Sequence, residues 1–77
     1  MADIAKTLDA SGLACPMPVV RARQAINELD AGQVLEVIST DRGSCSDMPA
    51  WAEATGNRLI EQREDDGPKY VFLIEKG

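Results

Sequence analysis

The chain contains no histidine among its 77 residues, and this absence excludes several kinds of chemistry. Histidine is the usual general base near neutral pH and the commonest metal ligand, so most hydrolytic mechanisms and histidine-based metal sites are hard to build here. The two cysteines are also too few for a closed structural zinc site, which takes four nitrogen or sulfur ligands. The sequence therefore predicts no metal site and no cofactor.

The sequence also lacks an excess of basic residues and any long hydrophobic run. Eight lysines and arginines stand against 13 acidic residues, for a formal net charge of −5, and only Arg21 and Arg23 lie close together. Nucleic-acid affinity rests on clustered basic side chains, so direct nucleic-acid binding is not expected as the main role. No segment has the length of a signal peptide or a membrane span. We expect a cytoplasmic protein without membrane contact, whose cysteines are free thiols in a reducing compartment.

What is present is the composition of a small globular domain. The hydrophobic fraction is 44% and the charged fraction 27%, both ordinary for a soluble fold. The chain length allows one domain with one modest core. No repeat, linker or low-complexity segment divides it, so residues 1–77 are predicted to form a single domain. Since no clear apolar stripe is left over, a monomer is expected when the protein is free.

The first half of the chain predicts a strand, a helix and a second strand. Residues 4–8 alternate between two faces, and residues 34–38 are rich in β-branched side chains. Between them, apolar residues recur at helical spacing from Val19 to Leu29, after two prolines that suit a first helical turn. The helix is expected to end near Gly32, a natural left-handed residue. These elements predict a right-handed βαβ unit with parallel strands.

The second half predicts another helix and two more strands. Ser46 is the expected N-cap of the helix, and Gly56 its end. Residues 58–64 and 69–75 are strand-like, and residues 65–68 between them predict a hairpin connection. The order β-α-β-α-β-β predicts an α/β (α+β) two-layer sandwich, with both helices on one face of a four-stranded mixed sheet.

Cys15 lies in the one stretch with evident chemical content, Gly12-Leu13-Ala14-Cys15-Pro16-Met17-Pro18. It occupies or adjoins the N-cap of the first helix, where backbone N–H groups lack partners and the helix dipole is positive. Such a site favours a thiolate, so we predict a lowered pKa for Cys15. Pro16 and Pro18 are expected to stiffen the turn. The residues alone allow equally well a small, buried, unreactive cysteine.

The stretch from Leu8 to Pro18 closely resembles the Cys-Pro-x-Pro signature of the TusA/SirA/YedF sulfur-carrier family. The extended Gly-Leu-x-Cys-Pro-x-Pro string is specific, whereas a bare Cys-Pro pair would not be. The resemblance continues in the chain length, the element order, Thr40-Asp41 and Asp47-Met48-Pro49. It implies a two-layer α/β sandwich, in agreement with the pattern of the elements.

The resemblance also implies a sulfurtransferase activity. Cys15 would accept sulfane sulfur as a persulfide and hand it to a partner protein, with Gly12, Pro16 and Pro18 shaping the turn. The implied donor is a cysteine desulfurase or a rhodanese-type protein, and the implied acceptor a DsrE-type relay protein. The implied routes are tRNA thiolation, cofactor sulfuration and dissimilatory sulfur oxidation. Because sulfur exchange between thiols needs no metal, nucleotide or histidine base, this chemistry suits the residues present.

Three further residues are candidates for accessory roles. Cys45 is open to four interpretations: a resolving thiol, a second sulfur-holding site, a disulfide partner of Cys15, or simply a small turn residue. Asp41 is expected to structure its loop, near the active cysteine or a partner. Arg21 is expected to be a solvated helix charge; the alternative is that it steers an acidic partner or supports the persulfide anion. Asp47 is explained by its place in the first turn of the second helix.

Two other functions stay open at this point. The alternative is a redox-sensing regulatory binding module that uses a Cys15–Cys45 disulfide, although the separation of the two thiols does not follow from the sequence. The third function is a nucleic-acid-binding regulator of similar fold, against which the acidic charge weighs.

Overall fold

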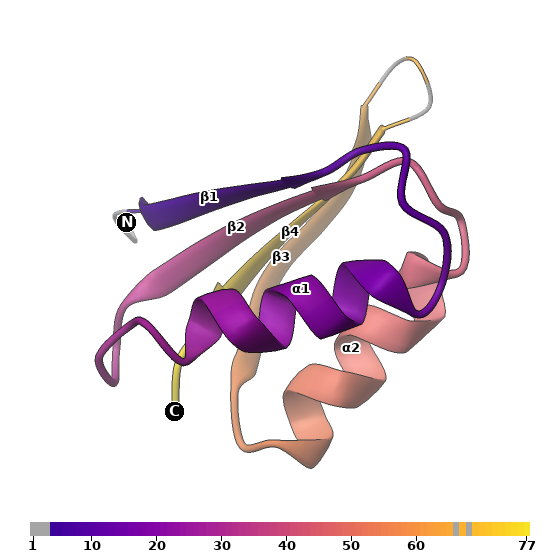
Figure 1. Ribbon diagram of the computed structural model, residues 1–77. Coiled ribbons are helices and arrows are strands. Elements are labelled where there is room, and N and C mark those ends of the chain that lie inside the picture. Colours follow the sequence, from indigo (N-terminus) through magenta and orange to yellow (C-terminus); the bar gives the residue numbers. More distant parts are fainter. Residues whose placement is uncertain (1–3, 66, 68) are drawn as a thin grey trace.

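Two helices lie against one face of a four-stranded sheet in the computed structural model, which describes residues 4–65, 67 and 69–77 (Figure 1). The strand order is β1-β2-β4-β3; β1 and β2 are parallel, and the other pairs are antiparallel. The predicted fold class and element order are confirmed. The elements are β1 Ile4–Ala10, α1 Met17–Ile26, β2 Val34–Ser39, α2 Ser44–Ala54, β3 Arg58–Asp65 and β4 Lys69–Glu75.

The core lies between the helices and the two central strands. Leu35 and Val37 of β2 pair with Ile74 and Phe72 of β4, and all four side chains are fully buried. The helices cover them mainly with small or flexible residues, which lets both helices pack close to the sheet: Ala22, Ala25, Ile26, Met48 and Ala52. The most apolar strands therefore occupy the middle of the sheet.

The first helix is shorter than the periodicity predicts. Its regular turns end at Ile26, although the buried Leu29 continues the apolar spacing. The N–H groups of residues 28 and 29 bond three residues back instead of four, so the chain tightens into turns while still facing the core. Gly32 has the predicted positive φ of 89°, but it lies in the loop before β2, where its N–H donates to the Lys76 carbonyl at 2.8 Å.

The second helix begins earlier than predicted, and the assignment of Ser46 as its N-cap is wrong. The N-cap is Gly43, and Pro49 lies inside the helix. Proline has no N–H for the carbonyl four residues back, which here is that of Cys45. The Gln62 side chain on β3 donates to this carbonyl at 3.4 Å, so a contact distant in sequence lets the helix start one turn before the proline.

The last two strands are confirmed, with β3 extending one residue beyond its predicted end at Glu64. Of the predicted hairpin connection at residues 65–68, Asp66 and Pro68 lie outside the described residues. Gly56 follows α2 with a φ of 77°, as expected for the end of a helix. No helix in the described part of the chain is long and apolar enough to cross a membrane.

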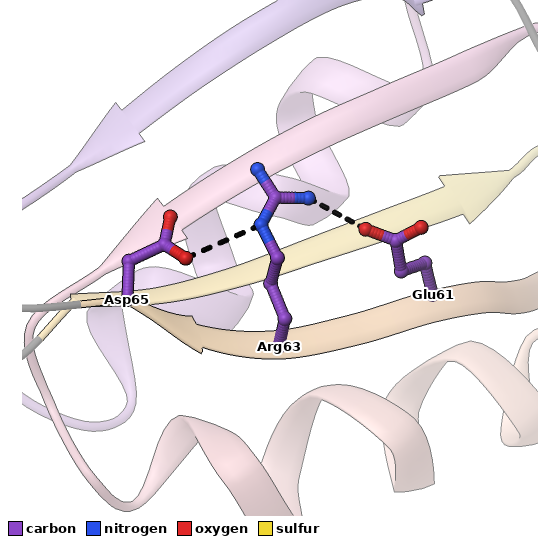
Figure 2. A network of polar contacts seen from close by, with 3 residues as sticks. All are labelled: Glu61, Arg63 and Asp65. Atoms are coloured by element: carbon purple, nitrogen blue, oxygen red, sulfur yellow. Dashed lines mark hydrogen bonds and ion pairs between the residues drawn. The ribbon is translucent and has the colours of Figure 1, made fainter.

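Charged residues line the outer strand β3. Figure 2 shows the Arg63 guanidinium between Glu61 and Asp65, at 2.5 Å and 3.4 Å from their carboxylate oxygens. The three residues are spaced two apart along the strand, so their side chains lie on the same face of it. All are nearly half exposed, so their pairing contributes little to stability. Their charges do disfavour pairing of this edge strand with another chain.

We predict that Leu35→Ala lowers the free energy of unfolding by about 2–5 kcal/mol, because it leaves a cavity beneath both helices. Chemical denaturation followed by circular dichroism measures this. Val20→Ala is the matched control on the exposed side of α1 and should change the value by less than about 0.5 kcal/mol. Equal losses in both variants would contradict this placement of the core.

Candidate functional site

Cys15 lies exposed in the loop between β1 and α1, immediately before the helix N-cap residue Pro16. This loop begins with a turn in which Gly12 has a φ of 81°, a conformation that favours glycine. The Gly12 N–H donates to the Thr40 hydroxyl at 2.8 Å, which ties the loop to the segment after β2. Since β1 and β2 are parallel, both loops emerge at the same end of the sheet (Figure 1).

Two carboxylates of the second loop and helix converge on Cys15. The backbone N–H of Cys15 donates to Asp41 Oδ2 at 2.9 Å, and its Sγ donates to Asp47 Oδ2 at 2.7 Å. Gly43 lies close to both Asp41 and Cys15: a Cβ at this position would be 3.1 Å from Asp41 Oδ2 and 3.6 Å from the Cys15 Cβ. A side chain at position 43 would therefore press on the Asp41 carboxylate.

This environment raises the pKa of the Cys15 thiol. The chief cause is the hydrogen bond to Asp47, followed by desolvation and the negative charges of Asp47 and Asp41, all of which favour the protonated, neutral thiol. The predicted lowering of this pKa is therefore wrong.

The reason is that the start of α1 offers the sulfur few free donors. Pro16 and Pro18 have no N–H, and the N–H of Met17 donates to the Ala14 carbonyl at 2.9 Å. The N–H of Cys15 itself is taken by Asp41. The direction of the pKa shift is instead decided by the hydrogen bond to Asp47 on α2, together with desolvation and the charges of Asp47 and Asp41.

The two prolines differ in their surroundings. Pro18 is fully buried in the first turn of α1, whereas Pro16 is exposed and follows Cys15 through a cis peptide bond. Met17 between them is 38% exposed, and Val20 one turn later is 37% exposed. Two exposed apolar side chains therefore lie in the first turn of the helix that follows the exposed thiol.

Cys45 has different surroundings from Cys15. It is half-buried in the first turn of α2 and packs against the core. It also lines a cleft of about 350 Å³ with Gln62, Glu64 and Tyr70. Both cysteines are free thiols.

Of the other predicted site residues, Asp41 contacts Cys15, whereas Arg21 is exposed on α1 without a hydrogen bond or ion pair to the described residues. The sequence predicts for Asp47 only a place in the first turn of its helix, and the structure adds its hydrogen bond with the Cys15 thiol. The Asp47-Met48-Pro49 string carried the only signal for it. Within the described residues, no three cysteine or carboxylate side chains gather closely enough to hold a metal ion.

Known proteins resemble the chain over nearly its full length. The family model for the sulfurtransferase TusA matches residues 6–76. The sulfur carrier protein TusA of Allochromatium vinosum is 53% identical over 76 residues, which make up 99% of each chain. The putative sulfur carrier protein YrkI of Bacillus subtilis is 53% identical over 72 residues, 94% of this chain and 95% of that protein.

A solved structure shares the fold. The crystal structure of a SirA-like protein from Desulfitobacterium hafniense matches with a TM-score of 0.83 and 36% sequence identity. The match covers 94% of this chain and 97% of that one. The two-layer arrangement that brings the Cys15 loop to the start of α2 is thus found in a relative as well.

We predict that Cys15 in the free protein ionises at a higher pH than an unperturbed cysteine, whose pKa is about 8.5. The cause is chiefly the hydrogen bond from the thiol to Asp47, together with desolvation and the negative charges of Asp47 and Asp41, which disfavour the thiolate. The rate of alkylation by iodoacetamide, measured across pH in a Cys45→Ser variant, reports this midpoint. A midpoint at or below that of a cysteine peptide would contradict the described contacts.

Proposed function

The chain belongs to the TusA sulfurtransferase family, and on that basis we propose that it carries sulfane sulfur as a persulfide on Cys15. A role in sulfur transfer together with partner proteins follows from the family itself.

The observation that carries the proposal is the presentation of the Cys15 thiol. It is exposed at the end of the sheet, while its backbone N–H and its sulfur are each held by a carboxylate. A sulfur atom that must meet two partner proteins in turn has to be accessible and in a defined position. Cys45, which is half-buried against the core, meets these requirements less well.

The reaction is an exchange between thiols. The Cys15 sulfur attacks the terminal sulfur of a donor persulfide, and the donor cysteine leaves as a thiol. One S–S bond forms and one breaks, so no outside oxidant or reductant is needed. The acceptor then removes the sulfur by the same reaction in reverse.

The partners that suit this chemistry are a cysteine desulfurase or rhodanese-type donor and a DsrE-type acceptor, meeting in the cytoplasm. Met17 and Val20, exposed in the first turn of α1 after the thiol, supply apolar contact area, and Arg21 adds a positive charge to the same helix. These few exposed residues suit a small, transient interface, which a carrier that exchanges partners needs.

We predict that the parent protein and its Cys45→Ser variant each gain the mass of one sulfur atom from a donor, while Cys15→Ser gains none. The donors are a cysteine desulfurase supplied with cysteine and a rhodanese supplied with thiosulfate. Intact-mass spectrometry measures the gain, and treatment with a reductant should remove it because the added sulfur is held by a reducible S–S bond.

The two cysteine-to-serine variants form a matched pair, since each removes one thiol and leaves the other. The proposal fails if the parent gains no sulfur from either donor, or if Cys15→Ser gains as much as the parent. Loss of sulfur uptake in Cys45→Ser alone would transfer the proposed role to Cys45.

A further inference from the structure

We propose that the Asp47 carboxylate is a catalytic group that takes the proton of the Cys15 thiol during sulfur transfer and returns it to the leaving donor thiolate. This inference rests on the proposed function, because it concerns the same reacting sulfur. It assigns to Asp47 more than the favourable interaction with the helix dipole that an acidic residue in the first turn of α2 has.

The geometry distinguishes the two carboxylates near Cys15. Asp47 Oδ2 lies 2.7 Å from Sγ and accepts the thiol hydrogen, whereas Asp41 Oδ2 accepts the backbone N–H at 2.9 Å. A general base must lie within hydrogen-bond reach of the proton that it removes, and Asp47 does. Asp41 therefore binds the backbone of Cys15, and only Asp47 binds the thiol hydrogen.

The position of Asp47 is set by buried contacts on either side of it. Met48, the next residue, is fully buried in the core. At the start of the helix, the buried hydroxyls of Ser44 and Ser39 share a hydrogen bond of 2.9 Å. Asp47 thus projects from a helix end that is fixed to β2, and its carboxylate does not depend on a flexible loop for its place.

Both charges that act on the thiol are negative, those of Asp47 from α2 and Asp41 from the preceding loop. They keep the unloaded sulfur protonated, so a thiolate is scarce near neutral pH. A thiol attacks a persulfide poorly unless its proton leaves as the S–S bond forms. The group that holds the proton in place is therefore also the group positioned to accept it.

The step balances without a further reactant. The Cys15 S–H bond breaks and its proton passes to Asp47, while the freed electron pair forms a bond to the terminal sulfur of the donor persulfide. The S–S bond of the donor breaks, and its electron pair stays on the donor cysteine. That thiolate takes the proton back from Asp47, leaving a Cys15 persulfide and a donor thiol.

The test compares Asp47→Asn with the parent, both in the Cys45→Ser background so that Cys15 is the single thiol. Thiolate ultraviolet absorbance across pH gives the fraction ionised, and intact mass gives the rate of sulfur uptake from whichever donor loads the parent. Asparagine cannot take a proton. We expect the thiolate midpoint to fall and the uptake rate per thiolate to drop by about a hundredfold, the low end of general-base effects.

A lowered midpoint by itself weakens the thiolate as a nucleophile by only about threefold per pH unit. A drop of less than about tenfold in the rate per thiolate would therefore overturn the catalytic role and leave Asp47 a residue that only adjusts ionisation. An unchanged midpoint would overturn the contact itself. Absence of sulfur uptake in the parent is a different result, because it defeats the proposed function together with this inference.

Two further variants complete the design. Asp47→Glu retains a carboxylate and should recover part of the lost rate, whereas a purely structural defect at this position would not be recovered. Glu53→Gln removes the same charge from the exposed far end of α2 and should leave both the midpoint and the rate unchanged. Circular dichroism of each variant confirms that it is folded.

Discussion

The parallel pairing of β1 with β2 is the constraint on which the site depends. The pairing runs to Ala10 opposite Ser39, so the chain leaves both strands at the same end of the sheet. One exit carries Cys15 into α1, and the other carries Asp41 and Asp47 into α2 (Figure 1). In an antiparallel pair these two exits would lie at opposite ends. The site is therefore a product of the sheet topology.

Hydrogen bonds of short polar side chains hold the two loops that leave β1 and β2 in place. Thr40 accepts the N–H of Gly12, and Ser39 both bonds to Ser44 and accepts the N–H of Asp41 at 3.1 Å. The serine pair is buried, where an unpaired hydroxyl would be costly, and these contacts satisfy both hydroxyls. The bond between Gly12 and Thr40 joins two segments that lie 28 residues apart in sequence. The two bonds of Ser39 order the second of these segments, between β2 and α2.

The environment of Cys15 limits the ionisation of its exposed thiol. A strongly ionised, exposed thiolate reacts with any oxidant or electrophile that it meets. Two carboxylates beside the sulfur favour the less reactive thiol instead. On the proposed function, reactivity depends on the approach of a donor, which the exposed Met17 side chain would contact.

The sequence by itself determined the fold class and the element order and indicated Cys15 as the candidate site, because these follow from local periodicity, turn residues and a motif within one short stretch. It also placed the end of α2 at Gly56, where a local left-handed turn decides the outcome. Tertiary structure decided where α2 begins, since the Gln62 side chain compensates the carbonyl that Pro49 leaves without a partner. It likewise decided the direction of the Cys15 pKa shift. A helix start predicts a stabilised thiolate, but the carboxylate that contacts the sulfur lies 32 residues away in sequence, and only the folding of the sheet brings the two together.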